Sequence, residues 1–232
     1  MTLSMPASGE TDADVIERLL RARHSCRGFK SDQVPQELIE RMFVIAQRTA
    51  SWCNSQPWKV IVTRGAETDR FRDAVFAQAT THEPTPDIPY PAEYRDVYLD
   101  RRRECGFQLY QSVGVERGDK AGGMKQTLQN FRLFGAPHVA IIHTEKVLGP
   151  YGAVDCGGFV ANLLTAAEAL GLGAIAQAAI ASQAAFVHDY FNIPADRDIV
   201  CAVSFGYEDK SHPTNSFRTS RADLADVVSW LG

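Results

Sequence analysis

The chain has 232 residues, of which 45% are hydrophobic and 22% are charged. This composition excludes a disordered chain and is sufficient for one sizeable core, so we expect a single domain over residues 1–232. The formal net charge is -4, which gives no basic excess for binding nucleic acid. The longest basic run, Arg101–Arg103, lies between Asp100 and Glu104 and indicates a solvated helix face.

Cysteine usage and the N-terminal sequence predict a cytoplasmic protein. The five cysteines form no C-x-x-C pair, which is typical of free thiols in a reducing compartment. Residues 1–14 are polar and acidic, without the apolar core of a signal peptide, and we expect residues 1–11 to be flexible. No apolar run is long enough to span a bilayer, so no membrane partner is expected.

The first part of the chain predicts two amphipathic helices followed by a strand. One helix is expected over residues 12–23, capped by Asp12, because its apolar residues recur at helical spacing. A second is expected from Pro35 to about residue 48, since proline favours a first helical position. A polar loop over residues 50–57 then leads into a β-branched strand over residues 58–63.

The remainder predicts an alternation of helices and strands. Prolines at 84, 86, 89 and 91 indicate a loop over residues 82–91. Residues 93–134 predict two helices with a glycine-rich connection, which could form a lid over a pocket. Strands are expected at 138–143, 173–176 and 199–205, and helices at 151–170, 182–191 and 223–231. Such an alternation is typical of an α/β sandwich.

Two segments carry residues suited to binding a ligand. Arg23 and Arg27 flank Ser25, and two guanidinium groups with a hydroxyl between them suit a phosphate. A helix C-terminus also favours cations, so a purely structural cap remains open. Residues 51–58 combine two indoles, two carboxamides and two hydroxyls, which fits either a planar heteroaromatic ligand or simple packing of the tryptophans.

Other chemistries are excluded by missing motifs. Gly171-Leu172-Gly173 has no third glycine at the offset that a Rossmann phosphate loop requires. The chain contains no G-x-S-x-G nucleophile elbow. Six histidines are scattered without an H-E-x-x-H motif, so no metal site is expected.

Several segments in combination resemble the FMN-dependent nitroreductase family in order and spacing. The first are Arg23-His24-Ser25-x-Arg27-x-Phe29 and Asn54-Ser55-Gln56-Pro57-Trp58. Further along stand Gly135-Ala136-Pro137, Gly171-Leu172-Gly173 before Gln177-Ala178-Ala179, and residues 215–221. Each piece alone is weak, whereas the combination is specific and extends from about Val15 to Trp230.

The resemblance implies a fold and an activity. The fold is α+β, a three-layer α/β/α sandwich of the nitroreductase type with a central mixed sheet flanked by helices, in an intertwined homodimer whose residues 207–232 wrap the partner. The activity is FMN-dependent transfer of electron pairs from NADH or NADPH to nitroaromatic or quinone acceptors by a ping-pong mechanism, without a catalytic side chain. Alternatives are reductive dehalogenation, flavin-fragmenting oxidation, or flavin binding without turnover.

The resemblance also assigns residues to the FMN phosphate and the pyrimidine edge of the flavin. Arg27 is expected at the pyrimidine edge, where a cation would stabilise the negative charge of reduced flavin near N1 and O2. The expected contacts on the phosphate side are Arg23, Ser25, Arg218, Ser220 and Arg221, and His24 is also expected to hold the FMN.

Three further groups are implied around the flavin ring. The backbone at Gln177, Ala178 and Ala179 is expected near N5, although these residues also fit a small-residue packing surface. Polar contacts to O2 and N3 are expected from Gln129, Asn130 and Arg132, for which an exposed polar helix face is the alternative. A loop that crosses the dimer interface is expected to contribute Ser51, Trp52 and Asn54. The family often has a small polar residue where Trp52 stands, which leaves the pocket size and the substrate preference open.

Overall fold

A computed structural model describes residues 9–232 of the chain. Residues 1–8, which make up most of the segment expected to be flexible, lie outside the described residues. The strands are β1 (Lys59–Arg64), β2 (His138–Glu145), β3 (Gly173–Gln177) and β4 (Arg197–Gly206). The helices are α1 (Asp12–Ala22), α2 (Gln36–Ala46), α3 (Ala66–Thr81), α4 (Asp96–Ser112), α5 (Lys120–Leu128), α6 (Gly149–Ala169), α7 (Ala178–Ala181) and α8 (Ala184–Phe191).

The strands form one four-stranded sheet in the order β1-β2-β4-β3, and all neighbouring strands pair antiparallel. Within residues 9–232, parallel pairing occurs only at a single bridge between Ser25 and Ala174. The expected mixture of parallel and antiparallel pairing is therefore restricted there to the β3 edge of the sheet. The bridge matters for the site because it attaches the segment after α1 to that edge.

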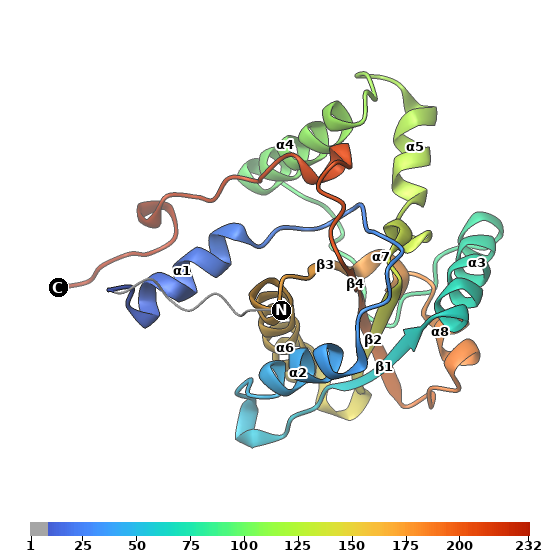
Figure 1. Cartoon of the computed structure of the whole chain (residues 1–232), viewed down its shortest axis with the longest axis horizontal. Helices are drawn as coiled ribbons and strands as arrows, with labels where there is room; N and C mark the ends of the chain where they lie inside the picture. Colours follow the sequence, from blue (N-terminus) through green and yellow to red (C-terminus); the bar gives the residue numbers. More distant parts are fainter. Residues whose placement is uncertain (1–8) are drawn as a thin grey trace.

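Helices cover both faces of the sheet, as expected for an α/β/α sandwich. Side chains alternate between the faces of a strand, and β2 shows this clearly. Ala140 and Ile142 pack with α2 and α6 in one core. Val139 and Ile141 pack with α3, α7 and α8 in the other. The expected three-layer architecture is therefore confirmed, and Figure 1 shows the layers around the sheet.

The start of α1 differs from the prediction in its capping residue. Thr11, not Asp12, is the N-cap, and its hydroxyl oxygen accepts a hydrogen bond from the backbone N–H of Asp14. The Asp14 carboxylate accepts a hydrogen bond from the backbone N–H of Thr11 at 2.9 Å. This reciprocal pair is a capping box, which satisfies two backbone donors that the helix itself cannot.

Two further elements differ from the predictions. Helix α3 was not predicted, because few large apolar residues mark its buried face, where Phe71 and Val75 lie. Conversely, residues 223–231 contain only a 3-10 turn at Leu224–Asp226 in place of the expected helix. Without a surface to pack against, a short helix is only marginally stable in water.

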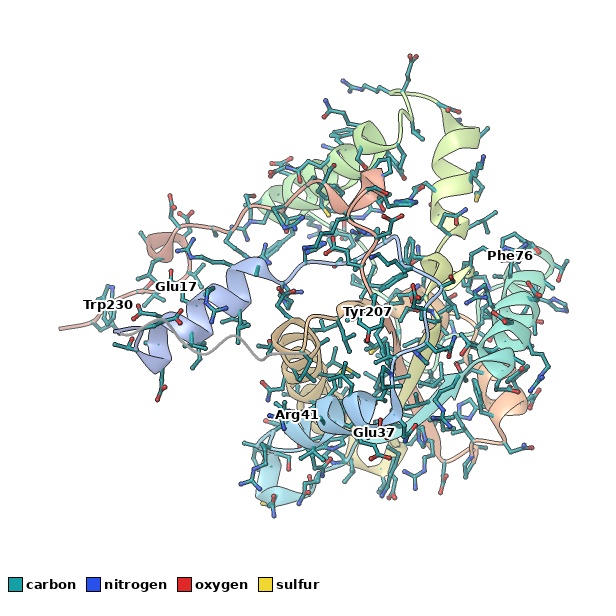
Figure 2. All side chains as sticks on the ribbon, in the orientation of Figure 1. Glu17, Glu37, Arg41, Phe76, Tyr207 and Trp230 are labelled. Atoms are coloured by element: carbon teal, nitrogen blue, oxygen red, sulfur yellow. The ribbon has the colours of Figure 1, made fainter. Side chains whose placement is uncertain are left out.

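Helix α1 and the C-terminal tail extend away from the sheet on the same side of the molecule (Figure 1). The apolar face of α1 is largely exposed, including Ile16 at 57% and Leu20 at 52%. Helix α1 and the tail at residues 217–232 together form an arm. Trp230 is 83% exposed and lies at the far end of this arm in Figure 2. The arm thus carries apolar side chains that a single chain does not cover.

The proline-rich segment over residues 82–91 is a loop, as predicted, and it is tied to the body at three points. The Thr85 N–H donates to the Ser182 carbonyl at 2.6 Å. The Asp87 carboxylate accepts from the Ile199 N–H and contacts His188, both at 2.8 Å. The Tyr90 hydroxyl donates to the Ala178 carbonyl at 2.6 Å.

Candidate cofactor site

The segment that follows α1 is held as an extra edge of the sheet. The Cys26 N–H donates to the Ala174 carbonyl on β3 at 3.1 Å, and the Lys30 N–H donates to the Tyr207 carbonyl at 2.9 Å. The Cys26 side chain is fully buried, and burial raises the pKa of its thiol to about 12. Gly28 permits a close approach, because a Cβ at this position would lie 2.3 Å from Cγ of His212.

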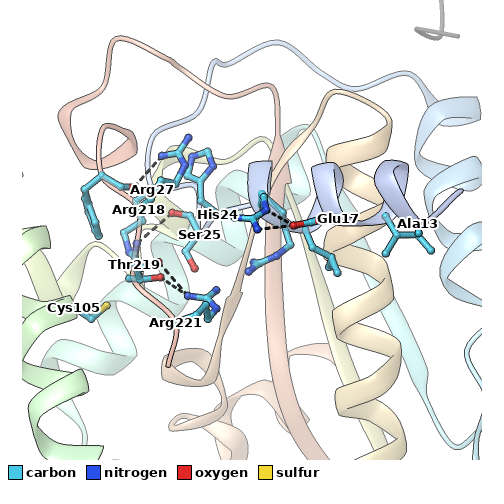
Figure 3. Close-up of a pocket in the computed structure, with 14 residues that line it drawn as sticks. Ala13, Glu17, His24, Ser25, Arg27, Cys105, Arg218, Thr219 and Arg221 are labelled. Carbon is cyan, nitrogen blue, oxygen red and sulfur yellow. Dashed lines mark hydrogen bonds and ion pairs between the residues drawn. The ribbon is translucent and has the colours of Figure 1, made fainter. Parts of the chain in front are cut away.

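A cavity of about 990 Å³ lies between α1, this segment and the tail at residues 217–221. Figure 3 shows its polar side, with Arg27, Arg218 and Arg221 on one wall and α1 opposite. The structure places six of the predicted site residues around this cavity: Arg23, His24, Ser25, Arg27, Arg218 and Arg221.

Five arginines line the cavity, and Arg21 among them pairs with Glu17 of the same helix. Within the part of the chain that the structure describes, none of the other four forms an ion pair with a carboxylate. Arg27, Arg218 and Arg221 donate to oxygens of Ser25, Asn215, Phe217, Thr219 and Ser220 through Nη1. Because a guanidinium has five N–H donors, Nε and Nη2 remain available to an anion.

The electrostatics of the cavity also favour an anion. Burial, and then repulsion by Arg221, hold the pKa of Arg23 below its usual value. Burial likewise lowers the pKa of Arg27. Partly buried cations that face one another cost free energy unless an opposite charge compensates them. Such an arrangement is typical of a functional anion site.

Two of the residues predicted to bind FMN are already bonded to acidic residues. The Nε2 atom of His24 lies 3.1 Å from the Glu208 carboxylate, and Ser220 donates to Glu104 at 3.2 Å. Ser220 lines an adjoining hollow of about 390 Å³ together with Arg221. Their predicted contacts with FMN stay predictions.

The residues expected near flavin N5 form a second polar group. Gln177 is buried; its amide donates to the Asn130 carbonyl at 2.8 Å and accepts from the Ser204 hydroxyl at 2.5 Å. Ala178 and Ala179 form the first turn of α7, where backbone N–H groups have no partner within the helix. The side chain of Gln177 thus ties the start of α7 to Asn130 and to Ser204 on β4.

The two neighbouring amides before β2 differ in their partners. The Asn130 amide donates to the Thr127 carbonyl at 3.0 Å, and its backbone carbonyl is taken by Gln177. The Gln129 side chain makes no hydrogen bond within the described residues. Gln129 is thus the amide that is free to bind a ligand.

Arg132 points to a different partner. Its guanidinium pairs with Asp73 at 2.9 Å and lies 3.6 Å from the centroid of the Phe76 ring on α3. The structure therefore does not bring this side chain to the arginine cavity, and its contact with O2 or N3 stays a prediction.

The loop with Ser51, Trp52 and Asn54 lies at the N-terminal end of α6 and lines no part of the arginine cavity. The Trp52 N–H donates to the Asp155 carboxylate at 3.1 Å, and its ring packs against Tyr151 with centroids 4.7 Å apart. Trp52 is nevertheless 61% exposed. Within one chain this loop cannot join the other predicted site residues.

Sequence reasoning missed several residues around the cavity. They are the α1 side chains Ile16 and Leu20, the α4 residue Cys105, the tail residues Phe217 and Thr219, and Asn215 behind the wall. The apolar face of α1 was recognised as a helix face, but the sequence contains no signal that this face borders a ligand cavity. Tail residue Thr219 lies inside the segment 215–221 that carries the family resemblance.

Residues 9–232 contain neither a candidate membrane-spanning helix nor a candidate metal site. No helix there is both long and apolar enough to cross a membrane. The same residues contain no cluster of three or more histidine, cysteine, aspartate or glutamate side chains arranged to hold a metal ion.

Comparison with known proteins identifies relatives along almost the whole chain. Nitroreductase NfnB from Mycolicibacterium smegmatis is 30% identical over 227 residues, which cover 97% of each protein. A 4-nitrobenzoate reductase from Nocardioides sp. is 28% identical over 99% of this chain and 93% of its own length.

Solved structures give the same result. The FMN-dependent nitroreductase NfnB from Mycobacterium smegmatis in complex with NADPH has a TM-score of 0.90 and 30% identity, covering 95% of this chain and 99% of that chain. The model of the nitroreductase family matches residues 20–207. The chain therefore belongs to the nitroreductase family, as the sequence motifs predicted.

Proposed function

We propose that the protein is an FMN-dependent oxidoreductase that transfers electron pairs from NAD(P)H to nitroaromatic or quinone acceptors. The observation that carries this proposal is the cavity in which four of the five lining arginines are paired with no carboxylate among the described residues. Support comes from the relatives, of which one is an FMN-dependent nitroreductase solved with NADPH and another a 4-nitrobenzoate reductase.

The residues present fit a flavin mononucleotide. Arg23, Arg218 and Arg221 would hold the phosphate with Ser25, because free guanidinium donors match phosphate oxygens in pairs. Arg27 would place its charge at the pyrimidine edge of the ring. Gln129 and the backbone at residues 178–179 would contact the remaining polar ring atoms. His24, Ser220 and Arg132 are secondary candidates because they have protein partners already.

FMN supplies the redox chemistry when bound, taking a hydride from NAD(P)H and passing electrons pairwise to the oxidant. The chain itself has to hold the ring, supply a fixed positive charge and leave one face open. No side chain needs to act as a nucleophile, and one site used in turn by both substrates predicts ping-pong kinetics.

The proposal is tested with purified protein and a panel of oxidants. We expect a yellow protein whose heat-released cofactor is FMN, since Arg23, Ser25 and Arg221 suit a terminal phosphate and no segment resembles an adenylate site. NADH or NADPH should be consumed rapidly only after a nitroaromatic or quinone is added, giving parallel double-reciprocal plots. Product analysis should find hydroxylamino compounds from nitroaromatics.

Other outcomes distinguish the alternatives. Halide release would indicate reductive dehalogenation, and loss of flavin absorbance with turnover would indicate flavin-fragmenting oxidation. A yellow protein that consumes no NAD(P)H with any oxidant would be a flavin-binding protein without turnover. Released FAD in place of FMN would contradict the assignment of the arginine cavity.

We further propose that the functional unit is a homodimer in the cytoplasm, where its five free thiols would remain reduced. Two features support the dimer. The loop at residues 51–54 could contribute to a flavin site only in a second copy of the chain. The arm formed by α1 and the tail carries exposed apolar residues, including Leu224 and Leu231, which a partner would bury.

Removal of residues 223–232 is expected to weaken the dimer while Arg221 is retained. The lost contacts are those of Leu224, Val227, Trp230 and Leu231, each of which is at least 66% exposed in the single chain. Sedimentation velocity over a concentration series should show the full-length protein as a dimer and the shortened chain shifted toward monomer. An active, FMN-saturated monomer of the full-length chain would contradict the proposal.

A further inference from the structure

Asn215 is a buried residue that connects the two segments on which the cavity arginines lie. Only 5% of its surface is exposed, at the end of the 3-10 turn Pro213–Asn215. Its side-chain oxygen accepts from the Arg27 N–H at 2.8 Å. Its amide nitrogen donates to the carbonyls of Gly28 and Asp209, both at 2.9 Å. Both donors of the carboxamide are thus used.

The backbone of the same residue holds another cation of the cavity. The Asn215 carbonyl accepts a hydrogen bond from Nη1 of Arg218 at 2.9 Å. One residue therefore contacts the main chain of Arg27 with its side chain and the guanidinium of Arg218 with its main chain. A shorter side chain would leave the Arg27 N–H without a partner in a partly buried place, which costs about 1 to 3 kcal/mol. The Gly28 and Asp209 carbonyls would each lose one bond but keep the backbone N–H groups of Asp209 and His212 as donors.

We propose that Asn215 is a positioning residue that fixes Arg27 relative to Arg218 and Arg221, and so sets both the affinity for the flavin and its reduction potential. This inference rests on the proposed FMN site. Arg27 has one other bond that holds it, from Nη1 to the Ser25 carbonyl at 3.2 Å, within its own segment. The stabilisation that a fixed charge provides depends on its distance from the charge that it faces, so a displaced Arg27 would favour the reduced cofactor less.

The Asn215→Ala variant is expected to bind FMN about tenfold more weakly than the parent. When saturated with FMN, it should have a lower midpoint potential than the parent. The decrease should be no larger than the decrease in Arg27→Ala. Affinity is measured by fluorescence titration of the apoprotein, and potential by equilibration with a reference dye. Asn215→Ser, which keeps one polar atom, should give a smaller shift and serves if Asn215→Ala does not fold.

A double-mutant cycle separates positioning from general stabilisation. If Asn215 acts on the potential through Arg27, adding Asn215→Ala to Arg27→Ala should shift the potential little further, because coupled residues are not additive. Thr214→Val is the matched control. Thr214 is equally buried and adjacent, and its hydroxyl bonds to His212, so its loss should lower the melting temperature without moving the potential.

The outcomes are distinct. A parent protein that binds no FMN would contradict the proposed function itself. A parent that binds FMN, with Asn215→Ala at an unchanged potential, or with equal shifts in the parent and Arg27→Ala backgrounds, would overturn the positioning role alone. The same potential shift in Thr214→Val would assign the effect to general loosening of the turn and would also overturn it.

Discussion

Replacing Arg27 with alanine is expected to lower the two-electron midpoint potential of bound FMN by about 20 to 60 mV. The change corresponds to about 1 to 3 kcal/mol, the range for a hydrogen bond to a charged group. Arg27 is partly buried, and burial lowers the pKa of its guanidinium. A preorganised cation in such a place interacts more strongly with the cofactor after it has gained negative charge. Hydride transfer from NAD(P)H, followed by stopped-flow absorbance, should slow accordingly.

Two further variants serve as controls for this result. Arg27→Lys keeps the charge and should recover most of the potential. Arg23→Ala should raise the FMN dissociation constant by about tenfold to a hundredfold through a lost phosphate contact, with little change in potential. An FMN-saturated Arg27→Ala protein with the potential and reduction rate of the parent would show that this residue does not lie against the ring.

Local patterns predicted most of the fold. The sequence predicted helices α1, α2 and α6 because their apolar residues recur at helical spacing, and it predicted the strands from runs of β-branched residues. The proline-rich loop was predicted because proline has no backbone N–H to donate a hydrogen bond within a helix or a sheet. Helix α3 was missed because only one narrow stripe, with Phe71 and Val75, faces the core. The predicted helix at residues 223–231 was wrong because its apolar residues have nothing to pack against within the chain.

The family motifs brought together the residues of one chain that form the cavity. Arg23, His24, Ser25 and Arg27 lie within one short segment, and Arg218 and Arg221 lie in another, so the order of these segments in the sequence was sufficient to predict them. Loop residues Ser51 to Asn54 do not line the cavity of the single chain, and their predicted contact with a flavin depends on the proposed second subunit. A role of this kind cannot be recognised from the periodicity of one sequence.

Asn215 illustrates a different limit of sequence reasoning. Its function is defined by partners 187 and 188 positions away in the chain, and a single asparagine near a turn has many other uses. Arg132 shows the converse. The family resemblance implied a ring contact for this residue, but Asp73 and Phe76 on the unpredicted helix α3 provide local partners.

His143 is expected to make the protein sensitive to acid. Its side chain on β2 is 7% exposed, and Nδ1 has no hydrogen-bond partner among the described residues. Burial, followed by the nearby charges of Arg197, His188 and Lys59, lowers the pKa of His143 to about 4 from 6.5. The unfolded chain therefore takes up a proton before the folded chain does as the pH falls. The contribution of His143 to the free energy of unfolding is therefore fully present above about pH 6.5. As the pH falls toward 4, the free energy of unfolding decreases by about 3 kcal/mol on account of this residue.

Urea unfolding at several pH values between 7 and 4 tests this expectation by comparing the parent with His143→Gln. His138 is also buried, and burial lowers its pKa; carboxylates add a pH dependence of their own. The informative quantity is therefore the slope of the free energy of unfolding against pH, compared between the two proteins. His143→Gln should lose less free energy of unfolding over this range, whatever its stability at pH 7. The exposed His82 gives a matched control, and His82→Gln should follow the parent. Parallel curves for the parent and His143→Gln would mean that His143 is already protonated, or already accessible to water, in the folded protein.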